Sequence, residues 1–327
     1  MRKNGKLILF LVYVDDILIT GEDSTLITQI IHTLSQKFAL KTLGTVNFFL
    51  GIHVFKTSSH SYLLNQSKYI NDLLTKTNLA DCKPQPSPYD ISSKLSLNDS
   101  PPFPNPTLYR STVGALQYLT LTRPDIAFMV NKLSQYLQTP TENQWKACKR
   151  LLRYLKGTLH YSLTFSPSSY LHLKVFSDAD WAGSIEDRKS TGGFFVFHGS
   201  NLLSWSSKKQ NVVFRSSTES EYRSLANSSA EVTWIQSLLH ELGFPIPHTP
   251  IIWCDNKSAA AIASNPVLHV RTKHIEIDTH FVRDNVLKKE LDVRYVPTEE
   301  QIADIFTKPL SISRFQYLIT KFPLEHG

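Results

Sequence analysis

The pattern of apolar and polar positions over residues 1–80 predicts both strands and helices. Short apolar runs bounded by turn residues indicate strands, whereas apolar residues that recur every three or four positions indicate amphipathic helices. The predicted elements are, in order, strands at 7–14 and 17–20, a helix at 25–38, strands at 48–55 and 62–64, and a helix at 67–79. This stretch is therefore expected to be an α+β unit whose first two strands form a buried hairpin.

The pattern changes at a proline-rich stretch. Residues 83–106 collect prolines together with serine and asparagine, which is typical of a linker or an extended strap and not of a packed element. Helical spacing returns at 108–120 and 125–137. A third helix is predicted to begin after Thr141, because Thr141 and Gln144 fit a capping-box pair.

The third helix presents two different faces. One is apolar, and the other is basic with i, i+3, i+4 and i+7 spacing. The basic residues are Lys146, Lys149, Arg150, Arg153 and Lys156. Such a stripe could follow a phosphate backbone. A solvated helix face has the same spacing, so both interpretations stay open.

Strand and helix patterns alternate from residue 171 onward. The predicted elements are strands at 171–176, 192–197 and 202–206, a helix at 218–242, a strand at 251–254, helices at 257–263 and 273–289, a strand at 292–296 and a last helix at 299–307. Strands interleaved with helices are typical of a mixed sheet flanked by helices. The expected fold class of this part is α/β.

Acidic residues of the α/β part fall at positions that could bring them together. Asp178 and Asp255 follow predicted strands, Glu221 lies early in the long helix, and Asp304 lies in the last one. Carboxylates at strand ends converge where a sheet opens. Unpaired, they would raise one another's pKa, a cost that hard divalent cations relieve. Two such ions about 4 Å apart can activate a water and stabilise the leaving oxygen of a phosphodiester.

Each of these acids also has an ordinary structural interpretation. Asp178 could be a turn residue, and Asp304 an exposed helix carboxylate. Glu221 could complete a capping box with Thr218, and Asp255 could help to cap the helix that follows it. Spacing alone leaves these alternatives open.

Composition narrows the class of protein. The 327 residues are 41% hydrophobic and 19% charged, which is ordinary for a globular protein, with a net charge of +7. A basic surplus favours an acidic partner such as nucleic acid, although a mildly basic protein without that partner has the same charge. The cysteines are few and far apart, so no zinc site or disulfide framework is supported, which fits a reducing compartment. The apolar run at 7–20 contains Asp15 and Asp16, which argues against a signal or membrane segment.

A series of short motifs carries the most specific information. The motifs are YVDD at 13–16 within LVYVDDILITG, FFLGIHV at 48–54, LYRSTVGALQYLTLTRPDIAFMVNKLSQYL at 108–137, RLLRYLKGT at 150–158, FSDADWAG at 176–183, RKSTGGFFVF at 188–197, STESEY at 217–222, WCDN at 253–256, TKHIEID at 272–278 and IADIFTKPL at 302–310. In this series and order, the chain resembles the Pol polyprotein of copia-type LTR retrotransposons over nearly its whole length.

The resemblance implies a domain organisation. The implied domains are a truncated reverse transcriptase palm with the start of the thumb at 1–80, a proline-rich linker at 81–107, a helical thumb or connection at 108–168, a ribonuclease H-like domain at 169–312 and a C-terminal tail at 313–327. The ribonuclease H-like domain would contain a mixed five-stranded sheet flanked by helices.

The resemblance also implies an activity, the metal-dependent hydrolysis of the RNA strand of RNA–DNA hybrids with two Mg²⁺ or Mn²⁺ ions. The implied catalytic and metal-binding residues are Asp178, Glu221, Asp255 and Asp304. Glu219 competes for the glutamate position, and His274 and Asp278 are polar neighbours without an assigned role. The expected nucleic-acid contacts are Lys146, Lys149, Arg150, Arg153, Lys156, Lys208, Lys209 and Arg215.

Asp15 and Asp16 resemble the paired metal-binding aspartates of a reverse transcriptase palm. In the family, the fingers and the first metal aspartate lie upstream of this motif, so an incomplete site without DNA polymerase activity is expected. The uncovered side of such a palm should be apolar. The alternative function is a catalytically silent nucleic-acid-binding remnant of a decayed element. No membrane association is expected, and the resemblance places the chain inside the cell, in a cytoplasmic particle or the nucleus.

Overall fold

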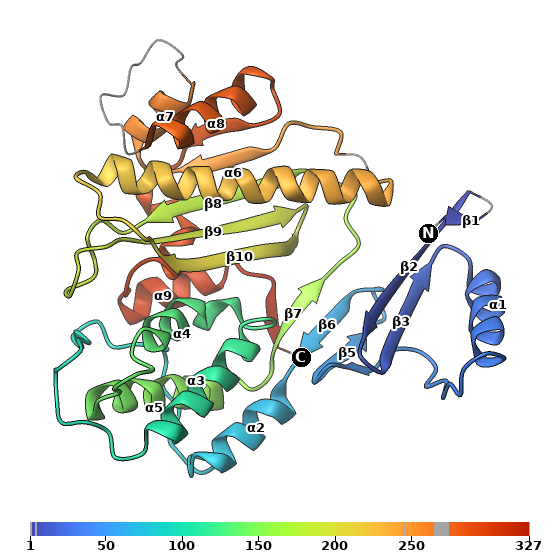
Figure 1. The fold of residues 1–327 in the computed structure, drawn as a ribbon, viewed down its shortest axis with the longest axis horizontal. Helices are drawn as coiled ribbons and strands as arrows, with labels where there is room; N and C mark the ends of the chain where they lie inside the picture. Colours follow the sequence, from blue (N-terminus) through green and yellow to red (C-terminus); the bar gives the residue numbers. More distant parts are fainter. Residues whose placement is uncertain (1, 4, 245, 265–274, 327) are drawn as a thin grey trace. The chain divides into compact units, whose positions relative to one another are not determined.

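The computed structural model describes residues 2–3, 5–244, 246–264 and 275–326 (Figure 1). Contacts divide the chain into two compact units, Met1–Phe55 and Lys56–Gly327. The YVDD motif lies in the first unit, whereas the four carboxylates of the predicted nuclease site all lie in the second.

The first unit contains an antiparallel sheet in the order β1-β2-β3. In chain order, the elements of this part of the chain are β1 (Arg2–Lys3), β2 (Lys6–Tyr13), β3 (Asp16–Gly21), α1 (Ser24–Ser35), β4 (Phe48–Phe49) and β5 (Ile52–Lys56). Only the first three belong to this sheet. The predicted hairpin is confirmed by β2 and β3, but its predicted burial is wrong. Leu7 and Ile8 are buried, whereas Val12 and Tyr13 are more than half exposed. The reason is that α1 packs on β3 and covers only part of the sheet, so the expected apolar exposed side is present.

The strand predicted at 48–55 is two strands, β4 and β5. Leu50 and Gly51 have positive φ angles of 48° and 73°, and the chain reverses between them so that Phe49 pairs with Ile52. Glycine adopts such an angle without a steric cost. An uninterrupted apolar run hides this reversal from a hydrophobicity pattern.

The second unit contains a mixed five-stranded sheet, as predicted. Its strands are β8 (Leu173–Ala179), β9 (Thr191–His198), β10 (Asn201–Lys209), β11 (Ile251–Cys254) and β12 (Asp292–Tyr295). The strands lie in the order β10-β9-β8-β11-β12. β9 is antiparallel to both β8 and β10, and β11 is parallel to both β8 and β12. The predicted α/β class with a mixed five-stranded sheet flanked by helices is therefore confirmed.

Helices cover both faces of this sheet (Figure 1). The helices and 3₁₀ turns are α2 (Ser67–Lys76), α3 (Pro106–Leu119), η1 (Pro124–Ile126), α4 (Ala127–Ser134), α5 (Glu142–Gly157), α6 (Ser217–Leu242), α7 (Lys257–Ser264), α8 (Glu276–Leu287), η3 (Thr298–Glu300), η4 (Ile302–Phe306) and α9 (Ile312–Ile319). Along β9, Phe194 and Val196 pack with α6, α7 and α8, whereas Phe195 and Phe197 pack with α3, α4, α5, η4 and α9. One of the two cores thus joins the helical part before residue 168 to the sheet after it.

Several predicted helices differ in detail. The helix expected at 125–137 begins with η1, and the helix expected at 273–289 is α8, which begins at Glu276. Residues 273 and 274 lie outside the described residues, so the polar neighbour His274 does too. The last helix expected at 299–307 is instead the two 3₁₀ turns η3 and η4. All residues of η4 are buried, which suits a tight turn inserted in a core better than an amphipathic α-helix.

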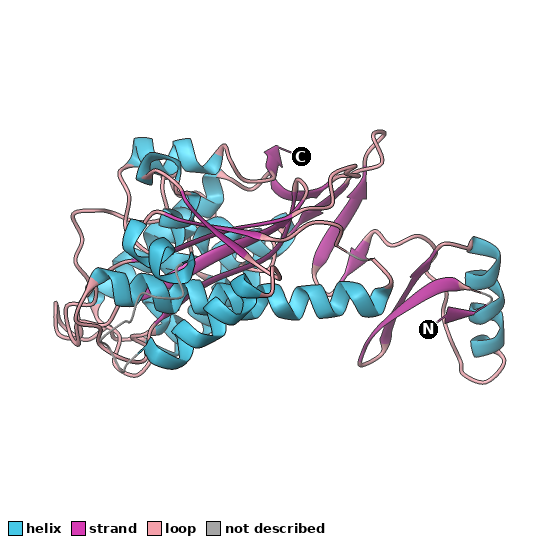
Figure 2. Cartoon of the chain, turned by 90° about the horizontal axis from the view of Figure 1, so that it is seen from above, coloured by secondary structure: helices cyan, strands magenta, loops and turns pink. Residues whose placement is uncertain are grey.

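The proline-rich segment is packed, contrary to the prediction. Residues 77–105, named the strap from here on, contain no helix or strand; Figure 1 shows them as the blue-green loop beside α5, and Figure 2 colours all such loops pink. Tyr89 and Leu95 of the strap are buried in the core, and the Tyr136 hydroxyl donates a 3.0 Å hydrogen bond to the Leu95 carbonyl. Of the two alternatives, linker or strap, the structure shows the strap. Its prolines exclude regular structure but not burial.

The segment predicted as a C-terminal tail, 313–327, also belongs to the core. Phe315, Leu318 and Phe322 recur at helical spacing and are buried. The strands that complete this region are β6 (Tyr62–Asn65), β7 (Tyr161–Phe165) and β13 (Leu324–His326). β7 pairs with both β6 and β13, and the sequence patterns did not predict β7. The tail prediction is wrong because these aromatic and aliphatic side chains have a core to fill.

Candidate metal centre and nucleic-acid interface

Two of the predicted carboxylates meet at one edge of the sheet. β8 and β11 are parallel neighbours, and Ser177 is in register with Cys254. The next residues, Asp178 and Asp255, therefore lie level with each other. Asp178 is inside β8 instead of after it, which excludes the turn interpretation. Asp255 follows β11 and accepts a 3.1 Å hydrogen bond from the Thr298 hydroxyl.

The alternative helix-capping roles are filled by other residues. α6 begins after Ser216, whose hydroxyl accepts a hydrogen bond from the Glu219 backbone N–H, and the Glu219 carboxylate accepts one from the Arg215 N–H. The predicted Thr218–Glu221 capping box is not formed. Instead, Glu221 accepts a 3.1 Å hydrogen bond from the Ala179 N–H. The competing candidate Glu219 is thus occupied at the start of the helix.

At the other predicted cap, Asn256 acts in place of Asp255. The Asn256 side-chain oxygen accepts a 2.9 Å hydrogen bond from the Ala259 N–H at the start of α7. Asp255 is left facing the other carboxylates. Oxygen atoms of Asp178, Asp255 and Asp304 lie within 4.8 Å of one another, and so do ligand atoms of Glu221, Cys254 and Asp255. The structure therefore brings the four predicted acids together around Asp255.

Burial and mutual repulsion raise the pKa values of these acids. Burial is the largest cause for all four, and the charge of Asp178 further raises the pKa of Glu221 and Asp255. Asp178 is 1% exposed, and its Oδ1 atom has no hydrogen-bond partner among the described residues. A buried acceptor without a donor, surrounded by other carboxylates, is an unfavourable arrangement that a cation corrects. The cluster can therefore hold a hard, oxygen-binding cation.

The Cys254 thiol lies beside the cluster. Burial raises the pKa of Cys254, as does the charge of Glu221, so the sulfur is held as a neutral thiol. It accepts a weak 3.4 Å hydrogen bond from the Asn256 N–H. The described acids therefore supply the charge of the site, and the sulfur supplies none.

Sequence reasoning missed Lys308, which inserts a positive charge into the cluster. Its ammonium lies 2.7 Å from Asp304 Oδ1 and 3.6 Å from Asp178 Oδ2. Burial alone would lower the pKa of Lys308, but Asp178 and Asp304 outweigh it and raise the pKa above its ordinary value. The preceding residue, Thr307, donates a hydrogen bond to Asp178 Oδ2. The sequence signals were the position of Lys308 within the IADIFTKPL motif and its i,i+4 spacing from Asp304.

Asp180 is a second acid that the sequence analysis did not single out. Its Oδ1 atom accepts a hydrogen bond from the Thr191 N–H, and burial raises its pKa to about 6. A Cβ atom at Gly183 would overlap the Asp180 carboxylate, so a larger residue there would require that side chain to move. The predicted polar neighbour Asp278 pairs with Arg223 at 2.9 Å and is not part of the carboxylate cluster.

The predicted basic stripe on α5 is partly engaged within the protein. Arg153 donates a 2.7 Å hydrogen bond to the Lys83 carbonyl, and Arg150 donates one of 3.2 Å to the Ser87 hydroxyl, so both hold the strap. Lys146 is exposed. Lys208 and Arg215, predicted contacts outside the stripe, are also exposed, whereas Lys209 pairs with Asp187 at 2.8 Å. Two arginines of the stripe therefore stabilise the packing of the strap, whereas Lys146 lies on the surface.

Some of these basic residues line a cavity of about 720 Å³ between the strap, α4, α5 and the chain after β8. Its basic lining residues are Lys94, Lys132, Lys146, Arg150, Arg188 and Lys209. Against these six, two acidic residues, Asp90 and Asp180, are among the described lining residues. Aromatic side chains, among them Phe128 and Trp181, add flat apolar surface. Positive charge with aromatic groups suits a nucleic-acid strand, and Asp180 places the cavity next to the carboxylate cluster.

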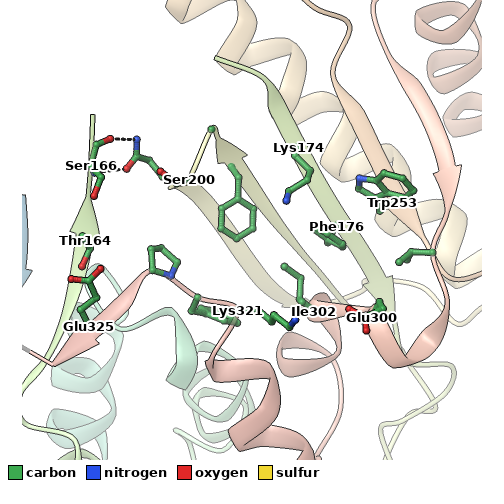
Figure 3. A pocket seen from close by; sticks show the side chains of 16 residues that line it. Thr164, Ser166, Lys174, Phe176, Ser200, Trp253, Glu300, Ile302, Lys321 and Glu325 are labelled. Atoms are coloured by element: carbon green, nitrogen blue, oxygen red, sulfur yellow. Dashed lines mark hydrogen bonds between the residues drawn. The ribbon is translucent and has the colours of Figure 1, made fainter. Parts of the chain in front are cut away.

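A second cavity of about 640 Å³ has a different character (Figure 3). Phe176 and Trp253 of the sheet lie across it from Ile302, as Figure 3 shows. Lys174 and Lys321 are balanced by Glu300 and Glu325 among its described lining residues. It lacks the positive surplus of the first cavity, so its lining suits a phosphate backbone less well.

The YVDD motif forms the turn between β2 and β3 in the first unit. Tyr13 pairs with Asp16, and Val14 has a φ of 49°, which places Asp15 and Asp16 at the tip. Both are exposed. Among the residues that the structure describes, neither belongs to a group of three or more potential metal ligands.

Comparisons with known proteins find relatives of this chain by sequence. A family model described as reverse transcriptase (RNA-dependent DNA polymerase) matches residues 1–90. The retrovirus-related Pol polyprotein from transposon RE2 of Arabidopsis thaliana is 48% identical over 316 residues, which are 97% of this chain and 22% of that protein. An uncharacterized mitochondrial protein of the same plant is 46% identical over 68% of this chain and 92% of its own length.

A solved structure of the foamy viral protease-reverse transcriptase in complex with RNA/DNA hybrid aligns with 92% of this chain and 37% of that one, at 13% identity and a TM-score of 0.47. By sequence, the chain belongs to the copia-type retrotransposon Pol polyprotein family. It spans about a fifth of the length of the RE2 polyprotein. In the described part of the chain, no helix is long and apolar enough to cross a membrane.

Proposed function

We propose that this chain is a retrotransposon Pol segment that hydrolyses the RNA strand of RNA–DNA hybrids with divalent metal, through Asp178, Glu221, Asp255 and Asp304. The observation that carries the proposal is the convergence of these four carboxylates, three of them buried and Asp255 half-buried, at the edge of the parallel β8–β11 pair. Mg²⁺ is the expected ion, with Mn²⁺ as a substitute, because the available ligands are carboxylate oxygens.

When bound, the metal supplies an activated water and stabilises the leaving oxygen of the phosphodiester. The residues of the chain hold the ligands in place. The Thr307 hydroxyl, the Ala179 N–H and the Thr298 hydroxyl each donate to one carboxylate, on Asp178, Glu221 and Asp255 respectively. Such partners fix the direction of the remaining carboxylate oxygens, and their loss usually costs 10–100-fold in affinity or activity.

The cationic cavity supports nucleic acid as the substrate class. Phosphate contacts position a strand without reading its sequence, so weak sequence preference is expected. Lys94 and Lys132 lie in this cavity and were not among the predicted contacts. Of those predicted, Lys146, Arg150 and Lys209 line it.

The test is cleavage of a duplex whose RNA strand is labelled. We expect cutting of RNA–DNA hybrid but not of duplex DNA, loss of cutting in EDTA, and loss in Asp255→Asn. Asp284→Asn is the matched control, because Asp284 is an exposed acid on α8. Cutting by Asp255→Asn at the control rate would refute the site. Hybrid binding without cutting by the unchanged chain would instead support a silent nucleic-acid-binding protein.

A further inference from the structure

The second cavity, of about 640 Å³, is distinct from the carboxylate cluster although two of the same strands contribute to it (Figure 3). Phe176 of β8 and Trp253 of β11 are in register, so their rings project from one face of the sheet. Ile302 lies across the cavity from them. None of the four carboxylates is among the described residues that line it. An aromatic and aliphatic cavity of this size suits a small organic ligand.

The two lysines that line this cavity are already engaged within the protein. Lys174 Nζ lies 5.6 Å from the ring centroid of Phe176 and 5.8 Å from that of Phe197. Lys321 Nζ lies 5.1 Å from the ring centroid of Tyr317. An ammonium over an aromatic face is attracted to that ring, so both positive charges have a favourable place without a ligand. The lining therefore favours an uncharged ligand over an anion.

The glutamates of the lining balance this charge and act as hydrogen-bond acceptors. The Tyr317 hydroxyl donates a 3.1 Å hydrogen bond to Glu300 Oε1, and Glu325 lies on the edge strand β13. An ionised carboxylate accepts hydrogen bonds but donates none. A ligand that fits these acceptors must therefore bring hydroxyl or amino donors of its own.

Thr164 of β7 supplies a polar group that lacks a partner. The residue is 4% exposed, and its Oγ1 atom has no hydrogen-bond partner among the described residues. Its backbone is fixed, because the Thr164 N–H donates a 2.8 Å hydrogen bond to the Pro323 carbonyl. Both residues line the cavity. A buried hydroxyl without a partner is unfavourable, and a ligand in the cavity can supply the missing hydrogen bond.

We propose that this cavity binds an uncharged nucleoside, a planar base that carries a hydroxylated sugar. The base stacks against Trp253 and Phe176, since every base presents a flat π-face to an aromatic side chain. The ribose hydroxyls donate to a glutamate of the lining, as ribose does to acidic residues in dinucleotide-binding folds. The Thr164 hydroxyl bonds to a polar atom of the ligand. This site goes beyond the proposed nuclease function and does not rest on it.

Equilibrium dialysis of the full chain against labelled adenosine tests the site. We expect saturable binding of adenosine, no tighter binding of adenosine monophosphate, and no binding of ribose alone. Thr164→Val should weaken adenosine binding by about tenfold, because it removes one hydrogen bond and keeps the shape of the side chain. Thr164→Ser, which keeps the hydroxyl, should bind as the unchanged chain does. Trp253→Leu should weaken binding by roughly tenfold or more, because it removes a stacking surface.

Thr112→Val is the matched control for the loss of the hydroxyl. Thr112 is another buried threonine whose Oγ1 atom has no hydrogen-bond partner among the described residues, but it lies in α3 and does not line the cavity. Both valine variants should be at least as stable as the unchanged chain, since each removes an unsatisfied hydroxyl. Of the two, Thr164→Val alone should lose affinity for adenosine.

Absence of saturable adenosine binding would overturn the proposal, and so would full binding by a stable Thr164→Val protein. If Thr164→Val does not fold, unweakened binding by Trp253→Leu would overturn it instead. Adenosine monophosphate that binds about tenfold tighter than adenosine would refute the uncharged ligand. Hybrid cutting without adenosine binding would refute this site and leave the proposed function standing, whereas adenosine binding without cutting would do the reverse.

Discussion

The chain contains two groups of acidic residues in opposite surroundings. Asp15 and Asp16 lie exposed at the tip of the β2–β3 hairpin, in the unit Met1–Phe55. Asp178, Glu221 and Asp304 are buried, Asp255 is half-buried, and burial raises the pKa values of all four. Both groups lie in specific family motifs, so motif strength does not distinguish them. The second group carries an electrostatic cost that metal binding can relieve, so metal binding to it is coupled to stability.

The largest effect is expected at a buried carboxylate with a permanent partner, Asp125. It accepts hydrogen bonds of 2.9 and 2.7 Å from Arg123 and one of 2.7 Å from the Tyr154 hydroxyl. Asp125→Asn should lower the free energy of unfolding by about 3–5 kcal/mol, because it leaves a buried guanidinium without its counter-charge. Urea denaturation measures this loss. The exposed substitution Asp284→Asn should change stability by less than about 0.5 kcal/mol. A loss as small for Asp125→Asn would contradict the role of the ion pair.

The next effect separates the two acidic groups by activity. Asp178→Asn should lower the rate of hybrid cleavage by about a hundredfold to a thousandfold, the range found when a preorganised electrostatic contact is removed. Asp16→Asn should leave the cleavage rate within about twofold. Single-turnover cleavage of a labelled hybrid measures both. Equal losses in the two variants would break the distinction between the groups.

Metal binding should stabilise the protein through the buried group only. With Mg²⁺ at a hundredfold excess over its Kd, the free energy of unfolding should rise by about 2.7 kcal/mol. Thermal melting followed by circular dichroism, with and without Mg²⁺, measures this gain. Asp178→Asn should abolish it and Asp16→Asn should keep it. A metal-dependent gain that survives in Asp178→Asn would place the ion elsewhere.

The smallest effect concerns pH in the absence of metal. The pKa of Asp180 is raised from 3.8 to about 6, so the folded state keeps a proton that the unfolded state releases. This contribution to stability is complete below the unfolded pKa and is lost as the pH rises through the folded pKa. Between pH 3.8 and about 6, the unchanged chain should lose about 2 kcal/mol relative to Asp180→Asn. Denaturation in EDTA across this range measures the difference, and parallel curves would disprove the shift.

Much of the site could be predicted because its carboxylates occupy recognisable places in the sequence. Asp178 and Asp255 sit at the ends of apolar runs that form adjacent parallel strands, and parallel neighbours bring such positions to one edge. Lys308 could not be found in this way. Its partner Asp178 lies far away in the sequence, and no spacing rule links a lysine two residues after a 3₁₀ turn to a residue in a strand.

Errors in the fold have a common physical origin. The predictions for the strap and for the segment 313–327 used local composition. Burial of a segment instead depends on whether distant parts of the chain leave apolar surface that the segment can cover. Tyr89 and Leu95 fill one such place between prolines, and Phe315 fills another. The spacing of Phe315, Leu318 and Phe322 was a usable signal for a helix with an apolar face.

The core that joins the helical part to the sheet has a consequence for synthesis on the ribosome. Its members range from Ile70 in α2 to Phe322 after α9, and β13 pairs with a strand that is made about 160 residues earlier. The part of this core that packs against residues 315–326 therefore stays uncovered until those residues have left the exit tunnel. During that interval the nascent chain is a natural client for a chaperone.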